Sequence, residues 1–230
     1  MEYTTLYSIL SLGFGLGLLH ALDADHIMAV SSLATSHNDR KKSWSGRKML
    51  WFCTRWAMGH GAILLALAFL FIFAKIELPT IIPYLAEKLV GCLLIGIGLW
   101  IGWNIYKNSI SLEVHTHKDD SDNDVVHMHL TTPGVNQHNH QPILVGMTHG
   151  LAGSAPVLAI IPATSQSNAL FGIAYVLVFC LGVIFSMMLF GLFFGRFQNW
   201  VAGASQKLFQ ISRLIIASIS IGFGTYWLIQ

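Results

Sequence analysis

The sequence predicts an all-α polytopic membrane protein, with six transmembrane helices arranged as two inverted repeats of three helices each. Three observations predict this class: the composition, the spacing of the apolar runs, and a likeness between the two halves of the chain. Of the 230 residues, 54% are hydrophobic and only 10% are charged, whereas soluble domains carry about 25% charged residues. The sequence has no basic patch interleaved with aromatic residues, which would indicate a nucleic-acid partner. Its apolar composition makes the lipid bilayer the expected environment.

A transmembrane helix needs about 20 predominantly apolar residues. Runs of this kind recur along the chain, separated by short polar segments. The expected spans are 6–33, 49–74, 84–106, 143–163, 170–197 and 209–229.

The basic residues predict how these spans are oriented. Of the 13 Lys and Arg residues, all but Lys75 and Lys88 fall in or beside alternate loops, those after the first, third and fifth spans. Lys and Arg accumulate in cytoplasmic loops. We therefore expect a multi-pass protein of the cytoplasmic (inner) membrane with both termini outside.

Short echoes between the halves indicate an internal repeat. The segment around His20 resembles the segment around His149, and residues 96–98 resemble residues 222–224. Because three spans is an odd number, two such units have opposite orientations, as in many transporters. We expect a first repeat at 1–107, a cytoplasmic loop at 108–141, and a second repeat at 142–230.

The expected loop is polar and rich in histidine. It holds three His-x-His pairs, which are His115 with His117, His127 with His129, and His138 with His140. Such pairs can chelate a metal ion weakly without a preformed fold, so an auxiliary metal-binding role is predicted; the alternative is a merely hydrophilic linker. Because its apolar content is low, we expect no regular structure here.

Four ionisable residues, His20, Asp23, Asp25 and His26, lie close together in the first expected span. Ionisable groups in a membrane are costly unless they are paired, hydrated or bound to a metal. On a regular helix His20, Asp23 and His26 would share a side and Asp25 would point away. Alternatively, the helix breaks and all four groups converge. Either carboxylate could be a ligand or could orient an imidazole.

Two further histidines, His60 and His149, lie beside glycines in the second and fourth expected spans. Each could complete a metal site, or could be a hydrogen-bonded packing residue. Imidazole nitrogen with few carboxylates suits Ni, Co, Zn or Cu. The candidate metal residues are His20, Asp23, Asp25, His26, His60 and His149.

Three segments together resemble a known family. HALDADHI at residues 20–27, Met58–Gly61, and the stretch from Gly146 to Ser154 are similar to the nickel/cobalt transporter family. Within that family the chain most resembles the short, six-span urease-accessory nickel permeases. The resemblance implies that His20, Asp25 and His26 recognise the metal and that His60 lies nearby. It also implies a cytoplasmic nickel chaperone as a candidate partner. The chain lacks two spans and the second acidic motif of the longer members.

The expected function is therefore secondary transport of Ni²⁺, or Co²⁺, in the direction of uptake. The metal ion is then a transported substrate, and no prosthetic group is expected. No nucleotide-binding motif is present. The alternatives are a metal exporter of the same fold and, more remotely, a membrane acyltransferase that uses the spacing of His20 and Asp25. The chain is not expected to be an enzyme.

Overall fold

The structure is a computed structural model that describes residues 2–36, 46–75, 81–110, 114–118, 124–128, 141–152, 155–164, 166 and 168–229. For residues 2–6, 108–110, 114–118, 124–128 and 155–157 it describes the backbone alone. The elements in chain order are α1 (Glu2–His20), α2 (Ala24–Ser36), α3 (Gly46–Phe69), η1 (Leu70–Ala74), α4 (Ile81–Ile110), β1 (Val114–Lys118), β2 (Asp124–Met128), α5 (Gln141–Leu151), α6 (Ala155–Thr164), α7 (Ala169–Ala204) and α8 (Gln206–Ile229).

The prediction of a helical, multi-pass membrane protein is confirmed, because the described chain is a bundle of apolar helices. By length and composition, α3 continued by η1, α4, α7 and α8 can each cross a membrane, and the bent pair α1 and α2 raises the number of candidate spans among the described residues to five. Helices satisfy all of their backbone hydrogen bonds internally, which the bilayer core requires. The protein is a multi-pass helical membrane protein.

Two of the expected spans are not continuous. The first divides into α1 and α2, whose axes differ in direction by 53°. The expected span 143–163 divides into α5 and α6, of 11 and 10 residues, and each is too short alone for a hydrocarbon layer of about 30 Å. The described structure therefore gives fewer continuous spans than the six that hydropathy predicted, because polar and small residues interrupt both helices.

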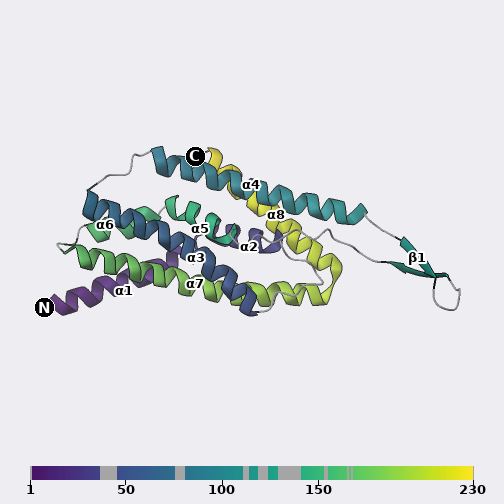
Figure 1. The fold of residues 1–230 in the computed structure, drawn as a ribbon, viewed down its shortest axis with the longest axis horizontal. Coiled ribbons are helices and arrows are strands. Elements are labelled where there is room, and N and C mark those ends of the chain that lie inside the picture. Colours follow the sequence, from purple (N-terminus) through teal and green to yellow (C-terminus); the bar gives the residue numbers. More distant parts are fainter. Residues whose placement is uncertain are drawn as a thin grey trace.

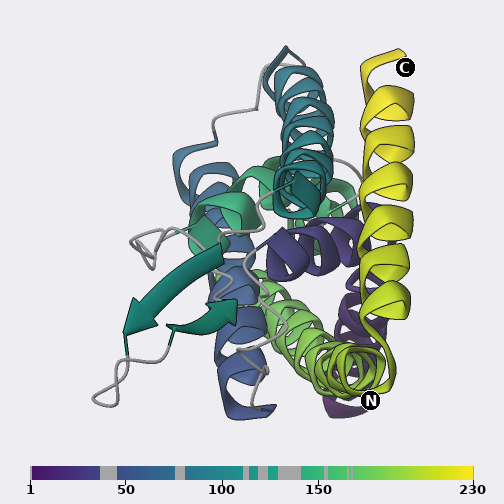
Figure 2. The same cartoon turned by 90° about the vertical axis from the view of Figure 1, so that its right-hand side faces the viewer.

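The long helices run along the bundle, and the short ones lie inside it (Figure 1). Helix α1 packs on α7, α5 packs on α3, and α4 packs along α8. Helix α2 contacts both α8 and α4 (Figure 2). The interior where these helices meet holds the bulky buried side chains Trp56, Tyr175 and Phe179.

Glycines allow the closest helix crossings. At the crossing of α1 and α7, a Cβ on Gly17 would overlap the carbonyl oxygen of Phe179, and one on Gly182 would overlap that of Phe14. Such contacts between backbones are typical of packing between membrane helices. They bring the end of α1, where the ionisable residues begin, against the middle of α7.

The crossing of α3 and α5 has the same construction. A Cβ on Gly146 would overlap the carbonyl oxygen of Trp56, and one on Gly59 would overlap that of Ile143. In all four cases the glycine lies three residues after a residue of its own helix whose carbonyl oxygen contacts the glycine of the partner helix. The two crossings therefore use the same pattern on different helices.

The contact between α4 and α8 is reciprocal. A Cβ on Gly98 would lie 2.8 Å from the carbonyl oxygen of Ala217, and one on Gly224 would lie 2.6 Å from that of Gly91. Gly98 follows Gly91 by seven residues on α4, and Gly224 follows Ala217 by seven residues on α8. Exchange of the two helices therefore reproduces the contact.

Part of the expected loop forms an antiparallel hairpin of β1 and β2, which projects beyond the helices (Figure 1). The expectation of no regular structure is wrong for these two strands. Their residues include β-branched Val and Thr at Val114, Thr116, Val125 and Val126, which favour extended backbone. The backbone register pairs His115 with His127.

Candidate metal centre

The site forms where α1 ends and α2 begins. Helix α1 ends at His20, and the turn that follows is held by hydrogen bonds from Leu22 N to Leu19 O (3.0 Å) and from Asp23 N to His20 O (3.0 Å). Helix α2 then starts at Ala24, directly after Asp23. Aspartate is favoured at helix N-termini, where exposed N–H groups and the helix dipole attract negative charge. Of the two alternatives for this segment, the broken helix is the one observed.

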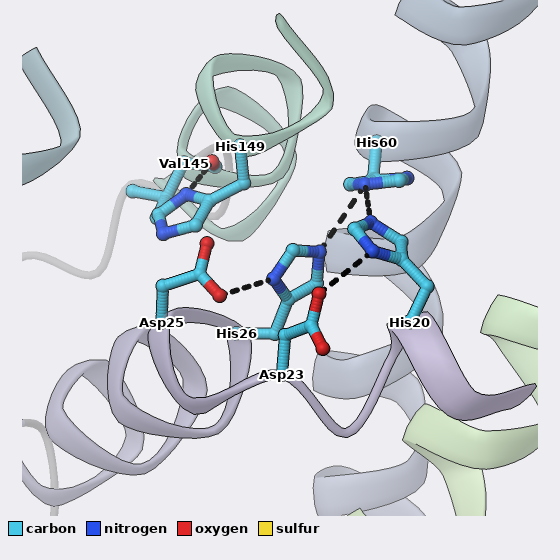
Figure 3. Close-up of polar contacts among 7 residues, drawn as sticks. All are labelled: His20, Asp23, Asp25, His26, His60, Val145 and His149. Carbon is cyan, nitrogen blue, oxygen red and sulfur yellow. Dashed lines mark hydrogen bonds and ion pairs between the residues drawn. The ribbon is translucent and has the colours of Figure 1, made fainter. Parts of the chain in front are cut away.

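The break brings three histidines together in the interior (Figure 3). The Nε2 atom of His60 lies 3.4 Å from Nε2 of His20 and 3.3 Å from Nε2 of His26. The three ligand atoms all lie within 4.8 Å of one another. The residues are 3%, 1% and 0% exposed for His20, His26 and His60. We call these three residues the histidine triad.

Two carboxylates set the protonation pattern of the triad. Nδ1 of His20 donates to Asp23 at 2.9 Å, and Nδ1 of His26 donates to Asp25 at 3.0 Å. A neutral imidazole carries one N–H, so the Nε2 atoms of His20 and His26 are the unprotonated ones. This carboxylate–imidazole arrangement is the one that orients metal-binding histidines.

The three imidazoles cannot satisfy all of their Nε2 lone pairs among themselves. Both His20 and His26 present a lone pair at Nε2, while His60 can bring at most one proton between them. The Nδ1 atom of His60 has no partner among the described residues. A cation placed between the three Nε2 atoms would satisfy all three lone pairs at once.

The two donor spacings that involve His60 suit a metal ion. With imidazole–metal bonds of about 2.0–2.1 Å, as for zinc, Nε2 atoms 3.3–3.4 Å apart subtend about 110° at the ion, which is close to the tetrahedral angle. The third pair of ligand atoms, from His20 and His26, lies within 4.8 Å. The two carboxylates add negative charge behind His20 and His26, which complements a divalent cation.

The carboxylates of Asp23 and Asp25 differ in environment. The side chain of Asp23 is 47% exposed, whereas that of Asp25 is 11% exposed. A charge in the bilayer interior costs about 2.5–3.5 kcal/mol even by lenient scales. Asp25, the buried carboxylate that accepts from His26, is therefore the more costly of the two to retain without a function.

His149 lies next to the triad but not within it. Its ring centroid is 5.7 Å from that of His26, and its Nδ1 atom donates to the carbonyl of Val145 at 2.8 Å. Its Nε2 atom is buried and has no hydrogen-bond partner among the described residues. Figure 3 shows the ring beside the carboxylate of Asp25. The structure thus gathers all six predicted metal residues into one region and brings three of them into ligand range of one another.

Trp56 is a member of this region that the sequence reasoning did not single out. Its ring stacks on His60 with centroids 5.6 Å apart, and it packs edge-on against His26 at 5.0 Å. It precedes His60 by four residues on α3, so both project from the same face of that helix. That spacing is the signal that could have identified it. Its bulk keeps the triad's surroundings apolar.

Three of the six predicted loop ligands are described by their backbone, and they lie away from this region. The backbone of His115, His117 and His127 lies in the projecting hairpin. His129, His138 and His140 lie outside the described residues.

Fold and site together define a multi-pass helical membrane protein with a buried three-histidine group suited to a metal ion. Residues 26–222 match the family described as cytochrome C biogenesis protein transmembrane region, and the chain belongs to this family. The match begins at His26, so His20, Asp23 and Asp25 precede it.

The chain is also similar to two named proteins. The chain is 30% identical to urease accessory protein UreH of Bacillus sp. (strain TB-90) over 194 residues, which are 83% of this chain and 77% of the relative. It is 23% identical over 220 residues to chloroplast protein FOR GROWTH AND FERTILITY 1 of Arabidopsis thaliana, covering 91% of this chain and 57% of the plant protein. No solved structure matches. The expected likeness to urease-accessory membrane proteins is confirmed, and neither relative nor the family is named as an enzyme.

Proposed function

We propose that this protein is a secondary transporter that moves Ni²⁺, or Co²⁺, across the cytoplasmic membrane in the direction of uptake. The observation that carries the proposal is the histidine triad, in which three buried Nε2 atoms converge and two are oriented by carboxylates. His60 completes the site from α3, and His149 stands beside it as a further ligand during passage. The urease-accessory name of the Bacillus relative agrees with nickel as the cargo.

The donor set supports a borderline transition metal. Imidazole nitrogen binds Ni, Co, Zn and Cu well, whereas Mg and Ca prefer several oxygen ligands. In this proposal the metal is cargo rather than a resident cofactor. A divalent cation entering a negative-inside cell gains about 4.6 kcal/mol per 100 mV, twice the single-charge value, so uptake needs no nucleotide in principle.

The paired glycine crossings support six membrane segments arranged as two inverted repeats. Gly17 and Gly146 each precede, by three residues, the histidine of their half, His20 and His149. The crossing of α1 with α7 has the same glycine pattern as the crossing of α5 with α3. The contact between α4 and α8 looks the same when the two helices are exchanged. A two-fold relation between the repeats produces this pattern. In it, α1 with α2 and α5 with α6 are two broken segments whose breaks adjoin the midplane site, as in other transporters.

The distribution of basic residues supports an inner-membrane orientation with both termini outside. The start of α3, the end of α4 and the junction of α7 with α8 lie at the same end of the bundle, where the hairpin projects (Figure 1). Arg47, Lys107 and Lys207 lie in these segments. By the positive-inside rule this end is cytoplasmic, which places the His-rich segment where it can pass metal to a nickel chaperone.

The acyltransferase alternative finds no support in the site. A catalytic pair of His20 and Asp25 would require Asp25 to orient His20, but His20 is bonded to Asp23 and Asp25 to His26. Export by the same fold uses the same triad and differs only in direction.

The test is ⁶³Ni uptake into proteoliposomes with an imposed negative-inside potential. We expect uptake by the intact protein and none by His60→Ala or His26→Ala, with all proteins inserted in equal amounts. Export is distinguished in cells, because loss of an importer lowers cellular nickel and loss of an exporter raises it. Equal nickel uptake by His60→Ala and the intact protein would overturn the proposal.

A further inference from the structure

Helix α2 is buried on most of its surface, and a stripe of residues with heteroatoms along one side leads away from the histidine triad. Asp25, Met28, Ser32 and Thr35 follow one another at three- and four-residue spacing, so they lie along one side of the helix. They are 9%, 8%, 0% and 1% exposed, respectively. Asp25, which orients His26, is therefore the first member of a line of heteroatoms. Ser32 lies about 10 Å further along the helix axis.

The far end of the stripe meets a buried amide from α7. Nε2 of Gln198 donates to Oγ1 of Thr35 at 3.2 Å. Gln198 is 1% exposed, and its Oε1 atom has no hydrogen-bond partner among the described residues. The Oγ atom of Ser32 likewise has no partner there. We call Ser32, Thr35 and Gln198 the oxygen group.

Unpartnered oxygens of this kind are exceptional in a membrane interior. Buried polar atoms are almost always hydrogen-bonded, and serines in membrane helices usually donate to a carbonyl one turn back. Ser31, the neighbour of Ser32, behaves in that way and donates to the carbonyl of Ile27. Ser32 does not, so its hydroxyl and the oxygen of Gln198 are available to a partner that is not part of the described protein.

The side chains described on α6, the short helix at the corresponding place in the second half of the chain, form no such stripe. The buried residues described on α6 are Ala159, Ile160 and Ala163. The oxygen group is therefore not a general requirement for packing a short helix into this fold. It belongs to the half that follows His26.

We propose that Ser32, Thr35 and Gln198 form a second ion site, lined by neutral oxygens, that receives the divalent cation after it leaves the histidine triad. This inference rests on the proposed function of the triad. Hydroxyl and amide oxygens bind a borderline metal more weakly than three imidazoles do. Conduction needs sites weak enough for the ion to leave, and a weaker second site lowers the barrier to departure.

The position of the oxygen group fits the release side. Helix α2 runs from the triad to Ser36, and the next segment contains Arg40, Lys41 and Lys42, which the positive-inside rule places in the cytoplasm. In uptake, the ion would meet the triad first and the oxygen group second.

The experiment measures binding and transport separately. Ser32→Ala, Thr35→Val and Gln198→Leu each remove an oxygen, and Ser31→Ala is the matched control, because its hydroxyl is satisfied within its own helix. Nickel affinity is measured by titration calorimetry on purified protein, and initial ⁶³Ni flux is measured in proteoliposomes. Thermal stability and membrane insertion are recorded for every variant.

We expect the three oxygen-group variants to bind nickel at the triad as the intact protein does, but to transport it about tenfold more slowly, the effect of losing one polar contact to a charged partner. Ser31→Ala should match the intact protein in both measurements. If Gln198→Leu does not insert, Ser32→Ala decides, since it removes a single oxygen.

Two results would overturn the second site. Flux in Ser32→Ala equal to that in Ser31→Ala would show that the oxygen does not serve the ion. Loss of nickel affinity in Ser32→Ala would make it part of the triad site instead. Failure of the proposed function reads differently, because His60→Ala would then bind nickel like the intact protein.

Discussion

The Nε2 atoms of His26 and His60 lie 3.3 Å apart, while Asp25 holds the opposite nitrogen of His26 at 3.0 Å. The lone pair of His26 is thereby aimed at a second imidazole from another helix. The Nε2 atom of His60 faces the lone pair of His20 as well, and a single proton on it can satisfy only one of the two. Most of the predictions that follow depend on this relationship.

Replacement of the central imidazole should abolish tight binding. His60 is the residue whose Nε2 contacts both other members of the triad, so His60→Ala removes a ligand and the link between α1, α2 and α3. We expect nickel affinity, measured by calorimetry, to fall by more than about 100-fold, which corresponds to about 2.8 kcal/mol of binding free energy. His149→Ala should cost less, because His149 lies outside the triad. The reverse ranking would place the metal at His149.

The two supporting carboxylates should differ in importance. Asp25→Asn keeps the shape of the side chain but removes the charge behind His26, and such partners typically contribute 10–100-fold in metal affinity. Asp23→Asn should have a smaller effect, since the side chain of Asp23 is 47% exposed and water can replace it as an acceptor. Dissociation constants of the two variants, compared side by side, test this order. Equal losses would contradict the predicted order.

Nickel binding should weaken as the pH falls. Metal and proton compete for the same imidazole nitrogens, and unperturbed imidazole titrates near pH 6.5. The protonated form cannot bind, so affinity should decrease as the pH falls and protons compete for the nitrogens, and nickel binding at low pH should release protons. Equilibrium dialysis with ⁶³Ni at a series of pH values measures the change in affinity. An affinity that stays constant down to the pH at which the protein unfolds would exclude imidazole ligation.

The crossing of α1 and α7 should be intolerant of a single methyl group. Gly17→Ala places a Cβ against the backbone of Phe179, and overpacking of this kind costs about 1–3 kcal/mol. Gly15→Ala, on the same helix, meets no atom within 4 Å and should be neutral or stabilising. Thermal unfolding in detergent should show a lower midpoint for Gly17→Ala alone. Equal midpoints would mean that α1 does not pack as described.

The loop histidines should add capacity without setting affinity. The register pairs His115 with His127, but the hairpin lies away from the triad. Replacement of all six loop histidines by alanine should lower the number of nickel ions bound per chain and leave the tightest site unchanged. Calorimetric stoichiometry measures both quantities. Loss of the tight site instead would relocate metal recognition to the loop.

Local sequence was sufficient for much of the site. His20, Asp23, Asp25 and His26 could be identified because charged and imidazole groups are so rarely retained within apolar runs. His60 was identified by its place in a second such run. What hydropathy could not reveal was the break after His20, because a window average of apolarity is the same for one bent segment as for one straight helix.

The oxygen group could not be predicted from the sequence, for a related reason. Ser32 and Gln198 are uncharged, and a lone serine or glutamine in an apolar run is usually satisfied by its own helix or a neighbour. Only the packed structure shows that their oxygens lack a partner among the residues it describes. Asp25 and Ser32 can be assigned to the same side of one helix because the structure shows that a new helix, α2, starts at Ala24.

The sequence by itself determined that this protein is a helical membrane protein and which imidazoles and carboxylates it retains there. Both follow from the cost of exposing polar groups to hydrocarbon, which is a property of each residue alone. The tertiary structure decided which carboxylate supports which histidine and which three nitrogens converge. Those outcomes depend on where α1 breaks and on how closely α3 approaches it, and both are set by contacts between residues that are distant in the chain.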